Sequence, residues 1–534
     1  MKRKISIILI ISVLFSSLLF SPDEVSAATK KIKVILSESQ DIAIEKNPSW
    51  LYTSDTRVGS NVSVSRICDL VEIDGGYTVI YPVDDKIYFR RMNPDLTVRD
   101  IISVKKRLDD LGGAICDADG NYYIAFGKND YDEKGGIVTF EIAKYDHKGK
   151  YLASYQYIPN IVDTGAWEEY LNYAGGWATK GPFGGGNCVM AIHDGILVCY
   201  MGRMMYNGHQ SSALYAVKTS DMTRTYGLFM YASHSFDQRI IVAGDGRFIT
   251  VDQSDGDPRG FTLSDCNDHT FTPFNCTGDR QQTYANLAGI AEAKDGFVLI
   301  GSSVKGDDTA ENKQLFMQVI SKDLGWVISS GERRTVHYYD RTIYDNGVIW
   351  LTDDDEFSIE GCNMTPTGDD RFFIAYTKAK NNGAREYCCM IVDVSGKIIL
   401  GETRLGSRIN NSEELKYANG YVYWTTGTGD WRDGNLYENT ITINRVNVND
   451  YKLLTISYKD SVAYTGKTLK PKVTIKLGKT KMKSKKAYTV TYTNSEYAPS
   501  KYITEKGTIK IAGKGKLKDF HITLSFDIFL KTDN

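Results

Sequence analysis

Apolar and aromatic residues recur along the chain in short runs between about residues 60 and 450. Each run follows a turn that usually contains glycine, and a second apolar run and a polar turn come after it. Short runs rich in β-branched and aromatic residues are typical of β-strands. The first runs of the units occupy residues 76–81, 121–126, 195–200, 246–251, 296–301, 371–376 and 420–424. Helical periodicity is confined to residues 37–46 and 166–173, so the pattern predicts an all-β fold.

The repetition of this pattern predicts how the strands assemble. Seven units fit it, and units of this size with four short strands each are typical of β-propeller blades. A single blade cannot bury both of its faces, so blades stack around an axis and the ring closes without long free edges. We therefore expect a seven-bladed β-propeller over residues 60–449, with a series of β-sandwiches as the alternative.

The N-terminus has the pattern of an export signal. Three basic residues precede an apolar run over residues 5–20, and small side chains precede a predicted cut after Ala27. This is typical of a secretory signal peptide over residues 1–27, the alternative being an uncleaved anchor. Residues 28–59 would then lead into the propeller. We expect an extracellular protein, secreted or cell-wall associated, with no transmembrane segment in the mature chain.

The composition changes sharply after residue 449. Lysine replaces acidic residues, and β-branched residues alternate with polar ones, as in residues 471–476. The pattern predicts a small β-sandwich over residues 450–534. Residues 464–476 and 488–494 resemble the immunoglobulin-like repeats of Gram-positive surface proteins, although residues 495–506 form a longer connection than the usual short turn. The resemblance implies an immunoglobulin-like domain on an exported protein.

The formal net charge of −2 conceals a split between these two parts. Residues 451–534 hold 18 Lys, no Arg and 6 acidic residues, a balance of +12, whereas residues 28–450 hold 43 basic and 58 acidic residues, a balance of −15. Lysine ammonium groups act as point charges without the bidentate fork of arginine. We therefore hypothesise that the Lys-rich domain holds the protein at an anionic cell-wall polymer, the alternative being a solubilising spacer. No nucleic-acid partner is expected.

The densest polar cluster occupies residues 233–238 and 251–259. A Ser-His-Ser-Phe element containing His234 precedes an Asp-rich element that ends at Arg259. This pair resembles a motif pair of uncharacterised secreted β-propeller proteins, and His209 with Gln210 resembles part of the same pattern. The resemblance implies the fold and an extracellular location rather than a reaction.

Three carboxylates in this cluster are candidate metal ligands. Asp252, Asp255 and Asp257 surround Gly256, and oxygen ligands on a tight glycine turn suit Ca²⁺. The spacing is not that of an EF-hand, and the alternative is a solvated acidic turn in which Arg259 pairs with one carboxylate. A second acidic run, residues 353–356, is expected to be a solvated turn as well.

Two histidines and an arginine are candidates for contact with an anionic ligand. Histidine can move a proton near neutral pH, and arginine can clamp a sulfate or phosphate group, so His209, His234 and Arg259 together would suit such a substrate. The alternative is that the histidines are structural. H-E-x-x-H, G-x-S-x-G and G-x-G-x-x-G motifs are absent from the sequence, so no common hydrolase or nucleotide site is indicated.

An insertion over residues 159–187 interrupts the repeat with aromatic residues set among glycines, including Trp167 and Trp177. Long loops of a propeller gather at one end of the ring, where ligands bind. These aromatic side chains would stack on sugar rings or contact a protein, the alternative being that the loop packs on itself.

Nine cysteines are present, an odd number, and Cys266 and Cys276 flank a polar loop as the best disulfide candidates. Most of the others lie in apolar runs and are expected to be buried thiols.

Taken together, these patterns predict a secreted or cell-surface binding protein. Its propeller would recognise a carbohydrate or a surface protein through His209, Gln210, His234, Arg259, Trp167 and Trp177, and its Lys-rich domain would hold it at the wall. The alternative is an extracellular hydrolase, lyase or sulfate-transferring enzyme that uses His209, His234 and Arg259. A structural wall component without a discrete site is a third interpretation.

Overall fold

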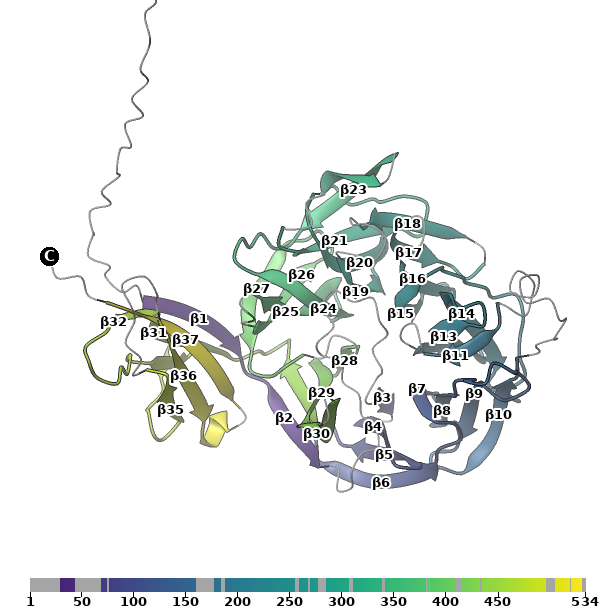
Figure 1. The fold of residues 1–534 in the computed structure, drawn as a ribbon, viewed down its shortest axis with the longest axis horizontal. Helices are drawn as coiled ribbons and strands as arrows, with labels where there is room; N and C mark the ends of the chain where they lie inside the picture. Colours follow the sequence, from purple (N-terminus) through teal and green to yellow (C-terminus); the bar gives the residue numbers. More distant parts are fainter. Residues whose placement is uncertain are drawn as a thin grey trace, which may run out of the picture.

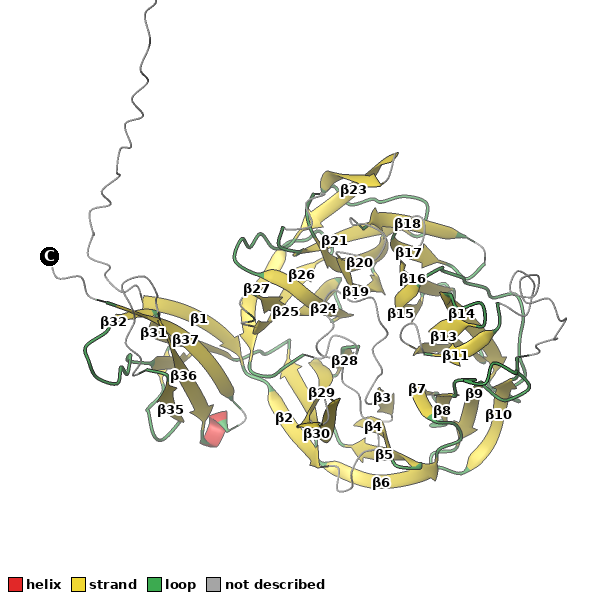
Figure 2. Cartoon of the chain, in the orientation of Figure 1, coloured by secondary structure: helices red, strands yellow, loops and turns green. Residues whose placement is uncertain are grey.

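The computed structural model describes most of the chain: residues 29–43, 69–73, 76–159, 177–183, 188–254, 259–267, 269–276, 285–306, 311–338, 341–380, 383, 385–409, 414–432, 435–495, 505–518 and 520–530. These residues form strands and loops, with one 3-10 turn at Gly515–Leu517 (Figure 2). The all-β prediction is therefore confirmed. No helix in the described part has the length and apolar character needed to cross a membrane.

Small sheets follow one another around a ring (Figure 1). Four of them are made of strands that are consecutive in the chain. Their strands are β3 (Asp69–Ile73), β4 (Gly76–Val83), β5 (Lys86–Met92) and β6 (Val98–Lys105); β7 (Asp110–Cys116), β8 (Tyr122–Gly127), β9 (Phe140–Tyr145) and β10 (Tyr151–Tyr157); β15 (Ser235–Val242), β16 (Phe248–Ser254), β17 (Gly260–Ser264) and β18 (Thr270–Asn275); and β24 (Ser358–Pro366), β25 (Arg371–Ala379), β26 (Arg385–Asp393) and β27 (Ile398–Leu405).

Two further ring sheets depart from this arrangement. In one, β11 (Thr179–Pro182) and β12 (Cys188–His193) pair with opposite ends of β13 (Ile196–Met205), which also pairs with β14 (Gln210–Lys218). In the other, β19 (Ala285–Glu292), β20 (Gly296–Ser303) and β21 (Gln314–Ser321) are joined by a hairpin of β22 (Glu332–Tyr338) and β23 (Arg341–Trp350). The hairpin extends beyond the outline of the ring (Figure 1).

The N-terminal segment completes the last sheet of the ring. The strands β28 (Lys416–Ala418), β29 (Tyr421–Arg432) and β30 (Asn435–Asn447) are joined by β2 (Glu38–Ala43), which pairs with β30 from Glu38 opposite Arg445 to Ala43 opposite Thr440. The helix predicted over residues 37–46 is therefore wrong for its described part. A strand forms instead because the free edge of β30 supplies a partner for every residue of β2, and such tertiary pairing overrides local propensity.

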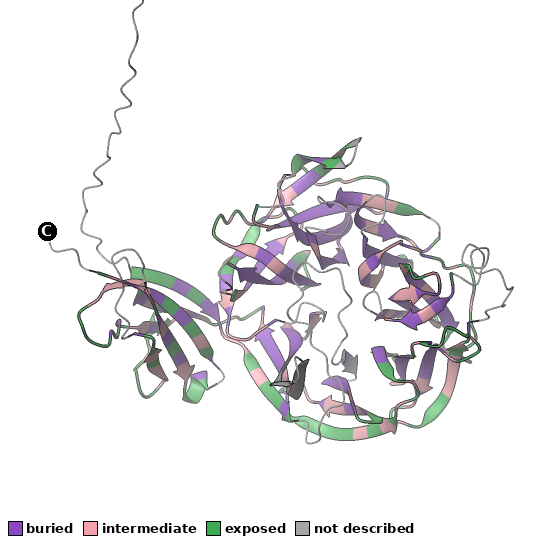
Figure 3. Cartoon of the chain, in the orientation of Figure 1, coloured by how far each residue is buried: buried purple, intermediate pink, exposed green. Residues whose placement is uncertain are grey.

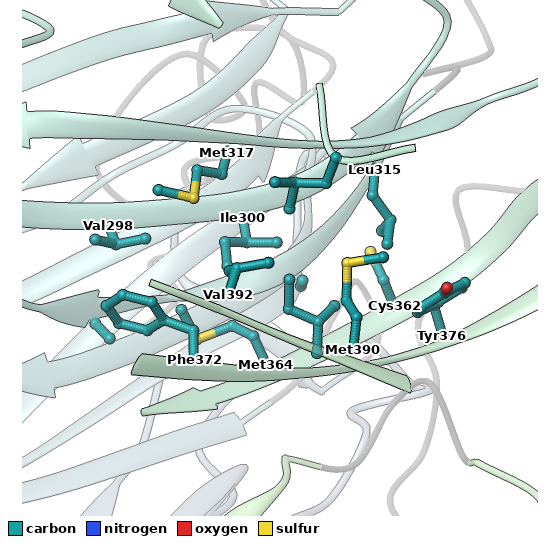
Figure 4. Close-up of a cluster of buried hydrophobic side chains, with 14 of the residues drawn as sticks. Val298, Ile300, Leu315, Met317, Cys362, Met364, Phe372, Tyr376, Met390 and Val392 are labelled. Atoms are coloured by element: carbon teal, nitrogen blue, oxygen red, sulfur yellow. The ribbon is translucent and has the colours of Figure 1, made fainter. Parts of the chain in front are cut away.

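Sheet-on-sheet packing explains why the apolar runs are continuous rather than alternating. Every residue of β8, β16, β20 and β21 is buried, because neighbouring sheets cover both faces of the middle strands. The outer strand β6 is largely exposed (Figure 3). One such core lies between the sheet of β20 and β21 and the sheet of β24 to β26, where Ile300 and Met317 meet Met364 and Val392 (Figure 4).

The C-terminal part consists of two sheets packed across one core. One sheet orders β1 (Thr29–Ile35), β31 (Leu453–Lys459), β33 (Thr474–Leu477) and β34 (Thr480–Lys481). The other orders β32 (Ser461–Ala463), β37 (His521–Phe529), β36 (Glu505–Gly513) and β35 (Tyr488–Thr493). Val34 and Ile456 from the first sheet share the core with Ile509 and Phe526 from the second.

The ring and the C-terminal part share one continuous sheet. Between them, β1 pairs antiparallel with β31 and, through Val34 and Ile35, parallel with β27 of the ring. This gives an eight-stranded sheet that runs from β24 to β34. The segment that the sequence suggested as a lead-in thus contributes β1 to the C-terminal part and β2 to the ring.

Candidate functional site

One end of the ring collects its long connections. Ser235, which begins β15, pairs with Ser254 at the end of β16, and Ser254 pairs with Gly260 at the start of β17. In the other ring sheets, too, neighbouring strands run in opposite directions. The links between sheets and the turns between the second and third strands therefore lie at the same end of the ring. We call this the loop end. The opposite end carries short turns, such as Asp117–Gly120, whose amide hydrogen bonds close a single turn.

Two of the predicted histidines lie side by side at the loop end. His209 is exposed and His234 half-buried, and their ring centroids are 5.9 Å apart. The backbone N–H of His234 donates to the carbonyl oxygen of Gln210 at 3.0 Å, which joins the segment before β15 to the start of β14. The structure therefore brings together His209, Gln210 and His234, three of the residues that the sequence singled out.

Local backbone geometry fixes both histidines. His209 follows an Asn-Gly turn in which Gly208 has a φ of 81° and the Asn207 side chain accepts from the His209 N–H at 3.0 Å. Glycine adopts this left-handed conformation without the steric cost that other residues pay. His234 itself has a φ of 51°, an uncommon conformation for a residue with a Cβ that is enriched at functional sites.

An aromatic pair lies at the same end of the ring as the histidines. Trp177 is 46% exposed, and its ring centroid is 5.3 Å from that of Tyr231, which is three residues before His234. Trp177 also precedes β11, where Thr179 pairs with Met205, and the N–H of Met205 donates to the carbonyl oxygen of His209. We refer to Trp177, Tyr231, His209 and His234 as the ring platform. Trp167 lies outside the described residues.

Asp252 is placed below this surface rather than on it. It is fully buried, and its Oδ2 accepts from the hydroxyls of Tyr200 at 2.7 Å and Ser235 at 2.6 Å, which links two neighbouring sheets. Burial raises the pKa of Asp252 to about 7, while the hydrogen bonds from Ser235 and Tyr200 oppose that shift. Its Oδ1 is buried without a hydrogen-bond partner.

The calcium hypothesis remains a prediction. Asp255 and Asp257 lie outside the described residues, so their relation to Asp252 is not part of the described structure. Among the residues that are described, no three His, Cys, Asp or Glu side chains gather as a metal site.

Arg259 is also buried, with 4% exposure, and its carbonyl oxygen accepts from the N–H of Cys276. Nearby, Arg334 and Asp345 form a buried ion pair at 2.8 Å, and the Asn275 side chain donates to the same carboxylate at 2.6 Å. Burial raises the pKa of Asp345, and Arg334 opposes the shift. No pattern in the sequence marks this pair, because its partners come from different strands.

The buried ammonium group of Lys378 could not be predicted from the sequence for the same reason. Lys378 is 6% exposed and contacts Asp354 at 2.5 Å and Glu402 at 3.0 Å. Two other residues of the acidic run over residues 353–356 also bind lysines, Asp353 to Lys305 and Glu356 to Lys380. The expected solvated turn is confirmed at Asp353, Asp355 and Glu356, which are exposed, whereas Asp354 is half-buried against Lys378.

The predicted disulfide between Cys266 and Cys276 does not form. Both are buried free thiols in separate cores, Cys266 beside Phe248 and Cys276 beside Phe274. The buried thiols expected in apolar runs are confirmed, for example at Cys199 and Cys389.

Comparisons with known proteins return only distant structural likenesses. No family model matches the chain, and no curated protein matches it. Solved structures similar to it include a member of the DUF4221 family from Bacteroides vulgatus, with 8% identity and a TM-score of 0.33 over 68% of this chain and 99% of that one.

Two glycosidases are also similar. Trypanosoma rangeli sialidase matches with 12% identity and a TM-score of 0.32, over 68% of this chain and 60% of that one. The catalytic domain of the Coprinopsis cinerea GH62 α-L-arabinofuranosidase matches with 8% identity and a TM-score of 0.29, over 49% of this chain and 90% of that one. Likenesses this distant leave the ligand and activity of this chain to be argued from its own residues.

Proposed function

We propose that the chain is a secreted or cell-surface carbohydrate-binding protein. In this proposal the ring is a seven-bladed β-propeller whose loop end binds the sugar, and the C-terminal part is an immunoglobulin-like sandwich that holds the protein at an anionic cell-wall polymer. The sheet order supports the blade assignment, because in the four sheets made of consecutive strands the first strand lies towards the centre and the fourth lies outermost, and β2 takes the outer place in the last sheet (Figure 1).

The ring platform carries the proposal for the loop end. Aromatic faces pack on the apolar faces of sugar rings, and imidazole and amide groups hydrogen-bond to hydroxyls. Trp177 and Tyr231 offer the first kind of contact, and His209, His234 and Gln210 offer the second at the same loop end. An exposed tryptophan in contact with a second aromatic ring is held in place before the ligand arrives, which lowers the entropic cost of binding.

The burial of Arg259 favours binding over the enzymatic alternative. An arginine that clamps an anionic substrate must reach that substrate, and Arg259 is 4% exposed whereas His209 is exposed. The one strongly perturbed carboxylate beside this surface, Asp252, is fully buried as well.

A glycan array tests this proposal. Binding should be lost in Trp177→Ala and retained in Trp326→Ala, because Trp326 is also an exposed tryptophan but lies in the turn after β21, at the end of the ring away from the loops. Equal binding by the two variants would contradict the role of the platform. Capture of a protein ligand but of no glycan by the unmodified chain would show that the ligand class is wrong.

Exposed charge supports the proposed wall contact. All 16 described lysines of residues 451–534 are exposed, and within the described part the only ion pair that they make is Lys506 with Asp527 at 3.9 Å. These ammonium groups are therefore available to a polyanion.

A further inference from the structure

A cavity of about 180 Å³ lies where the chain passes between the ring and the C-terminal part. The chain crosses there twice, once from β1 to β2 at Leu36 and Ser37 and once from β30 to β31 at residues 448–452. The N–H of Leu36 donates to the carbonyl oxygen of Lys452 at 2.9 Å, so the two crossings are tied together.

One wall of the cavity is fixed by Arg445. Its Nε donates to the Glu38 carboxylate at 2.8 Å, a second guanidinium nitrogen contacts the same carboxylate, and a third donates to the carbonyl oxygen of Pro94. The guanidinium also lies 4.4 Å from the centre of the Tyr421 ring. Arg445 and Glu38 therefore neutralise each other's charge and form this wall of the cavity.

The remaining charges of the lining are not balanced in this way. Lys452 comes from the second crossing and Lys516 from the 3-10 turn of the C-terminal part, and both are exposed. Among the described residues neither ammonium group is joined to a carboxylate. Among the described residues of the lining, Asp450 is the one further carboxylate, and Tyr421, Tyr451 and Phe520 provide the aromatic surface.

We propose that this cavity binds one phosphate-bearing polyol or sugar unit. The phosphate lies between the ammonium groups of Lys452 and Lys516, hydroxyls donate to the Asp450 carboxylate, and the carbon skeleton packs on Tyr451 and Phe520. At roughly 30 Å³ per liquid water, the cavity has the volume of about six waters, which suits a single unit rather than a run of polymer.

This proposal rests on the proposed wall contact and deepens it. The diffuse charge of the C-terminal part attracts any polyanion, whereas the cavity recognises its repeating unit. The same chemistry is present in a free polyol phosphate and in a polymer of such units, so the experiment includes both.

Calorimetric titration of the full chain with glycerol 3-phosphate tests the cavity. The double variant Lys452→Gln/Lys516→Gln should bind about ten-fold more weakly, since each exposed ion pair contributes up to about 1 kcal/mol. The matched control is Lys476→Gln/Lys510→Gln, which removes the same charge from exposed lysines of the same part outside the cavity. The control should bind within two-fold of the unmodified chain, and all variants should keep its melting temperature.

No measurable binding of glycerol 3-phosphate to the unmodified chain, or equal losses in the two double variants, would overturn the proposal. A second titration uses a glycerol-phosphate polymer. If the polymer is not retained at all but the monomer binds in the cavity, the wall contact is wrong and the cavity stands. If polymer retention falls equally in both double variants, diffuse charge alone holds the polymer and the cavity is not its recognition site.

Discussion

Val34 of the first strand and Arg404 of the ring strand β27 are register partners in a parallel pair. Val34 is fully buried, and on its other side it pairs with Leu454 of β31. The C-terminal part is thus incomplete without a strand from the opposite end of the chain.

This pairing predicts how the C-terminal part behaves alone. Residues 450–534 should not unfold cooperatively, because without β1 the apolar side chains of β31 lose their neighbouring strand. Fusing residues 28–36 in front of them through a flexible linker should restore a cooperative transition in urea. The same fusion carrying Val34→Asp is the control and should fail, since it buries an unpaired charge. Cooperative unfolding of residues 450–534 without β1 would contradict the prediction.

Asp252 predicts an unusual dependence of stability on pH. Its pKa is raised from 3.8 to about 7 by burial, so between these values the folded state holds a proton that the unfolded state has released. Stability therefore falls as pH rises from about 4 to 7, by about 4 kcal/mol if this group acts alone. The difference in unfolding free energy between the unmodified chain and Asp252→Asn, measured in urea from pH 5 to 8, should show this slope. A difference that does not change with pH would contradict it.

The buried pair of Arg334 and Asp345 predicts an asymmetric response to mutation. Asp345→Ala leaves the guanidinium buried without its carboxylate and should lower the free energy of unfolding by about 3–5 kcal/mol. The double change Arg334→Met/Asp345→Leu should cost much less, because it removes both charges. Urea denaturation of the two variants distinguishes the cases, and equal losses would show that packing rather than charge determines the stability of this hairpin.

The lysines of the C-terminal part predict a salt-dependent contact with the cell wall. Exposed charges are screened over about 10 Å at 0.1 M salt and about 3 Å at 1 M. Retention of the full chain on purified walls should therefore fall steeply between these concentrations. The glycan binding of the ring platform, measured in the same buffers, serves as the control and should change little. Undiminished retention on walls at 1 M salt would rule out electrostatic attachment.

The strands of the ring could be predicted from sequence because burial there is nearly uniform along each run. Residues 296–301 illustrate this, since every residue is buried between two neighbouring sheets. The segment Glu38–Ala43 was mispredicted because its partner, β30, lies some 400 positions later, and no local pattern reports such a pairing.

The site was only partly predictable for a similar reason. His209 and His234 could be found because polar motifs mark the turns that bear them. The burial of Asp252 and Arg259 could not be predicted, because it depends on how neighbouring sheets pack, which no local sequence pattern reports. Tyr231 carried no motif at all, and only its contact with Trp177 places it in the platform.

The two strands at the start of the chain also impose an order on biosynthesis. Both β1 and β2 emerge from the ribosome long before their partners β31 and β30 are made. Neither the ring nor the C-terminal part can close until almost the whole polypeptide has been synthesised, and pairings of such high sequence separation form slowly. The nascent chain therefore leaves both parts unclosed until its last strands have been made.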